Sequence, residues 1–285
     1  MQKLLFVGLG RMGANMAAHL AKSTDYQVSV WNRSEQKIQT WLDANLGSAY
    51  QQRETYDTIV LCVGNDHDVR SLLTGEQGLL KQLKSGGHVI DHTTTSAELS
   101  REMHAAAIEL NGHYLDAPVS GGEVGAVNGA LSCMVGGSEM AMKSCKAMLQ
   151  AYCANIVYIG ESGAGQITKM ANQLCIAGLL AGLSEAITLV KNEGLEADNV
   201  FNAIKGGAAQ SWQLDNRFNT MVKGEFDFGF AIDHMIKDLK YAIDQSTKQG
   251  WNPTVSSMVC EWYETLSEQG GSTEDTSSLI KHYQA

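Results

Sequence analysis

The sequence of 285 residues contains only two prolines, and its six cysteines are dispersed without a CxxC pair. It therefore has no Pro-rich linker, and it lacks the ligand spacing of a zinc site. The 21 basic residues form no dense tract and the formal net charge is −10, which disfavours binding to nucleic acid or to an acidic membrane. No stretch reaches the roughly 20 apolar residues that span a bilayer, and no secretory signal pattern precedes the first apolar run. These absences predict a soluble, cytoplasmic protein without a metal ion.

A glycine-rich turn follows the first apolar run. Residues 4–7 are Leu-Leu-Phe-Val, and Gly8, Gly10 and Gly13 follow in the pattern G-x-G-x-x-G. In such a turn the first glycine lets the chain leave the strand sharply, the second lets the backbone approach a pyrophosphate, and the third lets the next helix pack closely. The helix expected over residues 14–22 would direct its free N–H groups at the phosphates. The pattern predicts a dinucleotide site made by these glycines and the residues between them: Leu9, Arg11 and Met12.

The residues after the second expected strand indicate which dinucleotide binds. About 20 residues past the glycine turn, an acid would bind the ribose 2′-hydroxyl of NAD, whereas an arginine accommodates the 2′-phosphate of NADP. This chain has Asn32, Arg33 and Ser34 there, and no acid. A guanidinium forms charge-assisted hydrogen bonds with a phosphate. We therefore predict NADP(H), with NAD(H) as the less favoured cofactor; the alternative is that Arg33 is a solvated loop cation.

Strands and helices alternate in the first part of the chain. We expect strands over residues 27–31, 58–63, 88–91, 114–117, 130–135 and 155–158, and helices over 35–45, 66–73, 96–110 and 139–152. This alternation predicts an α/β fold, with a Rossmann doubly wound parallel sheet in a domain of residues 1–162. Ligands of such sheets bind beyond the carboxyl ends of the strands, where Val63, Gly64 and Thr94 lie. We expect these three residues to contact the cofactor.

From residue 163 the pattern is helical throughout. A long apolar helix is expected over residues 165–193, and shorter helices over 198–205, 212–223, 232–249 and 254–269. These predict an all-α C-terminal domain of residues 163–285 for substrate binding and oligomerisation. A helix that is apolar all round is buried in a core or against a partner subunit, so we expect a homodimer or homotetramer.

Four ordered segments carry a family resemblance. They are the glycine turn with Met16 and Ala17 behind it, residues 116–122 (DAPVSGG) followed by Gly125 and Ala126, residues 163–165 (GAG) followed by Lys169 and Asn172, and residues 237–239 (KDL). Together they resemble the β-hydroxyacid dehydrogenase family, which includes 3-hydroxyisobutyrate dehydrogenases, tartronate semialdehyde reductases and glyoxylate/succinate semialdehyde reductases. The resemblance covers almost the whole chain. It implies an enzyme that interconverts a short 3-hydroxy acid and its semialdehyde by metal-free hydride transfer.

Lys169 is the candidate acid/base. It lies early on a helix that is otherwise apolar or small, where burial would disfavour the ammonium form and make the amine usable for proton transfer. The resemblance implies that this lysine protonates the forming alkoxide and, in reverse, removes the hydroxyl proton. Asn172, one turn later, is implied to hold the substrate hydroxyl or to orient the amine; the alternative is a structural helix–helix hydrogen bond. Gln173 stands where many relatives carry a second asparagine.

The segment Ser120, Gly121 and Gly122 is a candidate substrate loop. Its hydroxyl and exposed N–H groups can bind a carboxylate without bulk, and the resemblance implies that they do so. The alternative is a structural turn. No G-x-S-x-G pattern surrounds Ser120, which argues against a hydrolase nucleophile.

The segment around residue 237 is implied to complete the site. By the resemblance, Lys237 and Phe230 lie near the cofactor, Asp238 supports the active-site lysine, and Lys240 reaches a distal acid group of the substrate. The alternatives are an exposed charged helix face for the lysines and a core position for Phe230.

Residues 91–95 (DHTTT) differ from the usual family pattern, because Thr93 replaces a serine. The resemblance still implies that Thr94 contacts the nicotinamide of the cofactor. His92 invites a general-base role, but a neutral histidine is favoured since Lys169 already fills that role. Alternative functions are an imine reductase, a 6-phosphogluconate dehydrogenase-like enzyme and a non-catalytic NADPH-sensing module. Lys169 argues against the first and the short chain against the second, whereas the intact glycine turn and lysine argue against the third.

Overall fold

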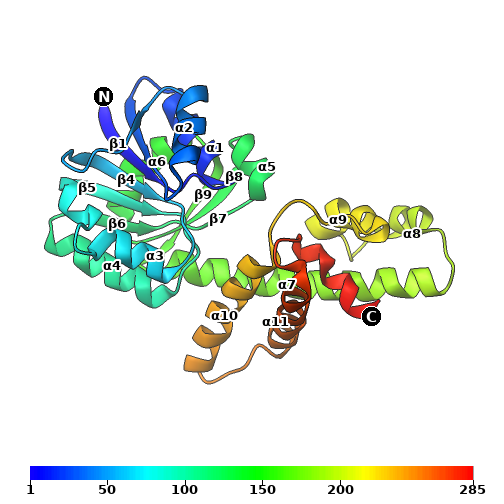
Figure 1. Ribbon diagram of the computed structural model, residues 1–285. Helices are drawn as coiled ribbons and strands as arrows, with labels where there is room; N and C mark the ends of the chain where they lie inside the picture. Colours follow the sequence, from blue (N-terminus) through cyan, green and yellow to red (C-terminus); the bar gives the residue numbers. More distant parts are fainter. Residues whose placement is uncertain (285) are drawn as a thin grey trace. The chain divides into compact units, whose positions relative to one another are not determined.

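The computed structural model describes residues 1–284, which form two compact units. The first unit is Met1–Lys169, and the second begins at Met170. The boundary expected after residue 162 falls just before helix α7 (Ala164–Asn192), which begins in the first unit and continues through the second (Figure 1). One helix therefore belongs to both units.

The first unit is built on a nine-stranded sheet. Its strands are β1 (Gln2–Val7), β2 (Tyr26–Trp31), β3 (Ser48–Ala49), β4 (Tyr56–Leu61), β5 (Leu83–Asp91), β6 (His113–Asp116), β7 (Val119–Ser120), β8 (Leu131–Gly136) and β9 (Cys153–Gly160). The order is β3-β2-β1-β4-β5-β6-β8-β7, with β9 also paired to β8. The pairs from β3 through β6 in this order are parallel, as is β8 with β9, whereas β8 is antiparallel to β6 and β7. The predicted doubly wound, mostly parallel sheet followed by a helical region is confirmed.

Strand β1 is buried on both faces of this sheet. Leu4 and Phe6 belong to one hydrophobic cluster, and Leu5 and Val7 belong to another. Successive strand residues point to opposite faces, so one short run supplies both cores. Burial of each such side chain contributes about 1.5–3 kcal/mol of transfer free energy to the stability of the fold. Because β2 and β4 flank β1 on opposite sides, its carboxyl end lies where the strand order reverses, the usual ligand position in doubly wound sheets.

The helices of the first unit are α1 (Gly13–Ala21), α2 (Glu35–Ala44), the 3-10 helix η1 (Leu79–Gln82), α3 (Asp66–Thr74), α4 (Ala97–Glu109), α5 (Gly122–Val127) and α6 (Glu139–Leu149). The longer predicted elements lie within a few residues of the observed bounds, except that β5 begins earlier than expected. The short elements β3, β7, η1 and α5 were not predicted, since segments of two to six residues are too short to show a period.

The second unit is helical. After α7 it contains α8 (Ala197–Ile204), α9 (Trp212–Lys223), α10 (Ile232–Lys248), α11 (Thr254–Leu266), a π-helical turn η2 (Ser267–Gly271) and a 3-10 helix η3 (Thr276–Tyr283). Its core joins Leu180 and Ile187 of α7 to Phe218, Leu239 and Tyr263 from three other helices. Figure 1 shows α7 as the long helix on which this unit is assembled. Helix α7 therefore supplies one side to the helical core, whereas Ile167, Leu179 and Leu189 on the same helix are exposed, so the predicted burial is only partial within one chain.

Helix α7 is also the one helix, among residues 1–284, that is long and apolar enough to cross a membrane by length and composition. The sequence prediction that no stretch is apolar enough is wrong by that criterion. A core helix of a soluble protein passes the same test, and α7 supplies buried residues to the helical core.

Candidate active site

The glycine turn has a geometry that explains each glycine. Gly8 has φ +103°, and a Cβ there would lie 2.1 Å from the Cys62 carbonyl oxygen. A Cβ on Gly13 would lie 2.0 Å from the Gly8 carbonyl oxygen, so α1 starts directly against the turn. Nothing lies within 4 Å of the Cβ position of Gly10. This open surface beside the first N–H groups of α1 fits a pyrophosphate. The cofactor contacts of Leu9, Arg11 and Met12 remain predictions.

Asn32 stabilises this turn from the end of β2. Its Oδ1 accepts a hydrogen bond from the Leu9 backbone N–H at 3.0 Å, and its Nδ2 donates to the Ser34 carbonyl oxygen at 3.4 Å. The amide therefore joins the glycine turn to the loop before α2. The sequence pattern indicated a cofactor contact for Asn32 but not this structural bond, because the two segments are distant in sequence.

Arg33 projects into solvent from the same loop. Its side chain is 81% exposed, and its guanidinium nitrogen lies 3.7 Å from Asp68 Oδ2 on α3. A Cβ on Gly64 would lie 2.5 Å from the same carboxylate oxygen. The cation is thus accessible to an anionic ligand, although an acid lies beside it. An exposed pair at this distance is weak, so it does not immobilise Arg33.

The ends of β4 and β5 are joined through Thr93. The Val63 N–H donates to Thr93 Oγ1 at 3.0 Å, and the Thr93 N–H donates to Asp91 Oδ1 at 2.8 Å. Asp91 also accepts from the Tyr114 hydroxyl, and burial raises the pKa of this carboxyl to about 6. Thr93 thus supplies the hydroxyl that a serine would supply at this position. Half-buried Thr94 follows directly.

His92 is a buried structural residue. Its Nδ1 lies 2.6 Å from the Ala117 carbonyl oxygen, and its Nε2 lies 2.9 Å from the Tyr152 hydroxyl. Burial lowers the pKa of His92 to about 4 because it disfavours the imidazolium. Since the Ala117 carbonyl can only accept, the neutral ring carries its proton on Nδ1 and accepts from Tyr152.

His92 should make stability depend on pH. A histidine titrates near 6.5 when unfolded, so the unfolded chain binds more protons than the folded one between about pH 4 and 6.5. The contribution of neutral His92 to the free energy of unfolding is fully present above about pH 6.5. It falls by about 3 kcal/mol in all as the pH is lowered toward 4. Buried Asp91 and Asp116 have pKa values raised to about 6, so they instead make the fold more stable as the pH falls. The measurement is therefore the difference in unfolding free energy between wild type and His92→Gln, which should shrink as the pH falls; a constant difference would contradict the assignment.

Lys169 is buried, with 7% of the residue exposed, on the second turn of α7. Asp116, at the end of β6, holds the start of this helix: its Oδ1 accepts from the Gly163 N–H at 2.8 Å and its Oδ2 from the Gln166 N–H at 3.1 Å. Burial raises the pKa of Asp116 to about 6. A carboxylate at a helix N-terminus satisfies its free N–H groups. The sequence pattern marked Asp116 only as the first residue of a segment, and nothing in it singled out Gln166.

The predicted substrate segment runs from the last residue of β7, Ser120, to the first residue of α5, Gly122. Gly121 and Gly122 have φ values of +128° and +62°, which glycine adopts readily, and nothing lies within 4 Å of the Cβ position of Gly122. Ser120 is half-buried in the β7–β8 pair. Glu123, at the start of α5, lies 3.7 Å from Arg11 of the glycine turn. The loop is therefore adjacent to the predicted phosphate site.

In the helical unit a chain of polar contacts joins α7 to α10. The Asn172 amide donates to Gln173 Oε1 at 2.8 Å, and Gln173 Nε2 donates to Asp238 Oδ2 at 2.7 Å. Lys237 Nζ lies 3.0 Å from Asp238 Oδ1, although no hydrogen bond from the described residues reaches this buried oxygen. The contact is thus an ion pair without hydrogen-bond geometry. Gln173, rather than a second asparagine, holds Asp238.

Lys240 and Phe230 lie elsewhere in this unit. Lys240 is exposed and forms an ion pair with Glu264 of α11 at 2.6 Å. Phe230 packs partly against the helical core, with its ring 5.8 Å from His234 and its N–H bonded to Asp275 Oδ2. The predicted ligand contacts of both residues remain predictions, and Lys240 would have to leave Glu264 to reach a substrate.

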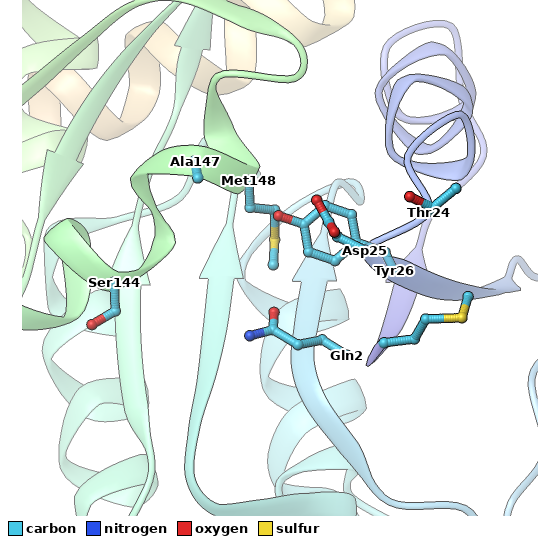
Figure 2. Close-up of a pocket in the computed structure, with 8 residues that line it drawn as sticks. Gln2, Thr24, Asp25, Tyr26, Ser144, Ala147 and Met148 are labelled. Carbon is cyan, nitrogen blue, oxygen red and sulfur yellow. The ribbon is translucent and has the colours of Figure 1, made fainter.

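The sheet unit has a separate hollow of about 390 Å³. Figure 2 shows its lining by Gln2, Tyr26 and Met148, which come from the starts of β1 and β2 and from α6. The glycine turn follows the opposite, carboxyl end of β1. This hollow therefore does not belong to the predicted cofactor site.

A doubly wound sheet with a G-x-G-x-x-G turn at its switch point, followed by a helical unit, defines a dinucleotide-binding protein. Residues 3–160 match the family model described as the NAD binding domain of 6-phosphogluconate dehydrogenase. Residues 163–283 match the model described as NAD-binding of NADP-dependent 3-hydroxyisobutyrate dehydrogenase. The chain belongs to the family of NAD(P)-dependent β-hydroxyacid dehydrogenases that includes 3-hydroxyisobutyrate dehydrogenase.

Individual relatives agree with this assignment. The chain is 42% identical to an uncharacterized oxidoreductase of Shewanella frigidimarina, over 98% of this chain and 97% of that one. It is 33% identical to 2-hydroxy-3-oxopropionate reductase of Escherichia coli, over 98% and 96% of the two chains. The structure of Mycobacterium tuberculosis 3-hydroxyisobutyrate dehydrogenase with L-serine superposes with a TM-score of 0.91 and 26% identity over the full length of both chains.

Proposed function

We propose that this protein is an NADP(H)-preferring dehydrogenase that interconverts a short 3-hydroxy acid and its semialdehyde, with Lys169 as the acid/base. The observation that carries the proposal is the burial of Lys169 on a helix whose start is hydrogen-bonded to Asp116 at the carboxyl end of the sheet. That edge is the one that also bears the glycine turn. Family membership supports the reaction class.

The chain supplies binding and proton transfer to this reaction. The bound cofactor supplies or accepts the hydride. Lys169 gives a proton to the carbonyl oxygen as the aldehyde is reduced and takes it back in the reverse direction. The Ser120 hydroxyl and the N–H groups of Gly121 and Gly122 bind the carboxylate of the acid, and Asn172 holds the reacting hydroxyl. Holding the reactants in line provides much of the rate.

The two parts of the chain are proposed to have different roles, one in cofactor binding and the other in substrate binding and subunit association. Residues 1–162 bind NADP, and residues 163–285 bind substrate and associate as a homodimer or homotetramer. Asp238 supports the lysine helix through Gln173, whose amide is bonded to its carboxylate. Lys237, Phe230, Val63, Gly64 and Thr94 contribute to cofactor binding.

The test is a substrate panel. NADPH oxidation is measured with glyoxylate and with succinate, methylmalonate and tartronate semialdehydes, beside NADH. We expect turnover of methylmalonate or tartronate semialdehyde, whose reduction gives 3-hydroxy acids, and a preference for NADPH. Turnover of glyoxylate or succinate semialdehyde alone would indicate a 2-hydroxy or a 4-hydroxy acid instead.

The panel also includes a cyclic imine with NADPH, and a phosphorylated sugar acid with NADP⁺ as the oxidant. Reduction of the imine alone would favour an imine reductase, and reduction of NADP⁺ with release of CO₂ would favour a 6-phosphogluconate dehydrogenase-like enzyme. NADPH binding without turnover of any compound would favour a sensing module.

Arg33→Ala tests the cofactor preference. A charge-assisted hydrogen bond contributes about 1.5–3 kcal/mol, so the ratio of kcat/KM for NADPH to that for NADH should fall about 10- to 100-fold. The matched control is Arg101→Ala, which removes an exposed arginine from α4 of the same unit and should leave the ratio unchanged. Equal losses with both cofactors would contradict the role of Arg33.

A further inference from the structure

Gln166 is fully buried in the first turn of α7, ahead of Lys169. Its side-chain Oε1 accepts a hydrogen bond from the Thr95 N–H at 3.1 Å, and its Nε2 donates to the Thr93 carbonyl oxygen at 2.7 Å. Because a backbone N–H only donates and a carbonyl only accepts, these two bonds determine the orientation of the amide. One side chain therefore holds the backbone on both sides of Thr94.

The backbone of Gln166 is held as firmly as its side chain. Its N–H donates to Oδ2 of Asp116, whose other oxygen accepts from the Gly163 N–H. A Cβ on Gly165 would lie 2.6 Å from the Asp116 carbonyl oxygen, so α7 starts in direct contact with the end of β6. The start of α7 cannot shift against residues 93–95 without leaving buried polar groups unpaired, which is costly.

We propose that Gln166 is a positioning residue that couples Thr94, expected beside the nicotinamide, to Lys169, the expected acid/base. The inference rests on the proposed function, because both of those roles come from it. Reduction of an aldehyde requires the carbonyl carbon to face the hydride donor while its oxygen faces the proton donor. In this chain residues 93–95 are expected beside the hydride donor, and helix α7 carries Lys169, the expected proton donor. The side-chain amide of Gln166 joins these two segments. Losing that amide should therefore impair the chemical step more than the binding of either reactant.

The first variant is Gln166→Met, which keeps the length of the side chain and removes both hydrogen bonds. Single-turnover hydride transfer should slow about 10- to 100-fold, the cost of a small misplacement of reacting groups. The dissociation constant of NADPH, measured by its fluorescence, and the KM of the aldehyde acid should change little. In the cofactor-free protein, hydrogen exchange at the Thr95 amide should accelerate about tenfold or more, because its acceptor is gone.

The matched control is Thr168→Val. It removes a hydrogen bond from the same part of α7, but one that runs only to Ala164 within the helix. Neither hydride transfer nor exchange at Thr95 should change.

The second variant, Gln166→Glu, separates positioning from packing. A protonated glutamate reproduces the donor and the acceptor, whereas its carboxylate would face the Thr93 carbonyl oxygen without a proton between them. The rate relative to wild type should therefore rise as the pH falls. The titratable groups around this position, Asp91, Asp116 and Lys169, are present in both proteins, so the ratio isolates residue 166. This variant also remains informative if Gln166→Met fails to fold.

Three results would overturn the proposal: exchange at Thr95 that matches wild type in Gln166→Met, a loss confined to KM, or a slowed Gln166→Glu whose rate relative to wild type does not recover as the pH falls. Failure of the proposed function appears differently, as wild-type protein that transfers hydride to no aldehyde acid. In that event the coupling to catalysis fails too, while hydrogen exchange still reports whether Gln166 holds residues 93–95.

Discussion

Lys169→Met is expected to slow hydride transfer about 10²- to 10⁴-fold, which is the contribution of a positioned general acid or base. Methionine keeps a flexible apolar stem in a site that is only 7% exposed, so the helix should remain packed while the amine is lost. NADPH should still bind, because Lys169 lies on α7 and not in the glycine turn. The measurement is single-turnover oxidation of NADPH with the aldehyde acid that wild type prefers.

The control for this variant is Lys191→Met, which removes an exposed lysine from the last turn of the same helix. It should leave hydride transfer unchanged. An equal loss in both variants, or a loss that appears only as a raised KM, would show that Lys169 does not transfer the proton.

Gly13→Ala should destabilise the sheet unit and abolish tight cofactor binding. The added Cβ would lie 2.0 Å from the Gly8 carbonyl oxygen, so α1 would have to move away from the turn that it supports. Overpacking of this kind costs about 1–3 kcal/mol or more. Thermal unfolding and NADPH fluorescence titration of the same preparations give both quantities.

Gly10→Ala is the informative companion. Its Cβ would meet nothing within 4 Å, so the fold should keep its stability while the methyl group occupies the space proposed for the pyrophosphate. NADPH affinity should fall without a fall in melting temperature. Gly178→Ala, on α7 and also without close neighbours, should change neither affinity nor fold and can raise stability through helix propensity. Full NADPH affinity in Gly10→Ala would place the phosphates elsewhere.

The features predicted correctly are those that depend on short, continuous segments of the sequence. Strands β1 and β4 each contain a continuous apolar run, because both faces of a parallel sheet are covered, and β1 shows how one run serves two cores. The G-x-G-x-x-G pattern is equally local in the sequence, although only Gly13 excludes a Cβ through an atom of the turn itself, the Gly8 carbonyl oxygen; Gly8 excludes one through the Cys62 carbonyl oxygen, which follows the neighbouring strand β4. The long helix α7 was visible as a long run of mostly small and apolar residues. These patterns suffice for the fold class, and with the spacing of four segments they suffice for the family.

The residues that hold the candidate site together were not visible in this way. Asn32 bonds to Leu9 and Gln166 to Thr93 and Thr95 across long intervals of sequence, and a buried amide has no periodic pattern that would mark it. The ion pair of Lys240 with Glu264 likewise depends on how α10 meets α11. The spacing of apolar residues follows from the local geometry of a helix or strand and from which of its faces meets solvent, so it can be recognised in the sequence. The partners of buried polar groups are selected by which distant segments the folded backbone brings within hydrogen-bond distance, and that information exists only in three dimensions.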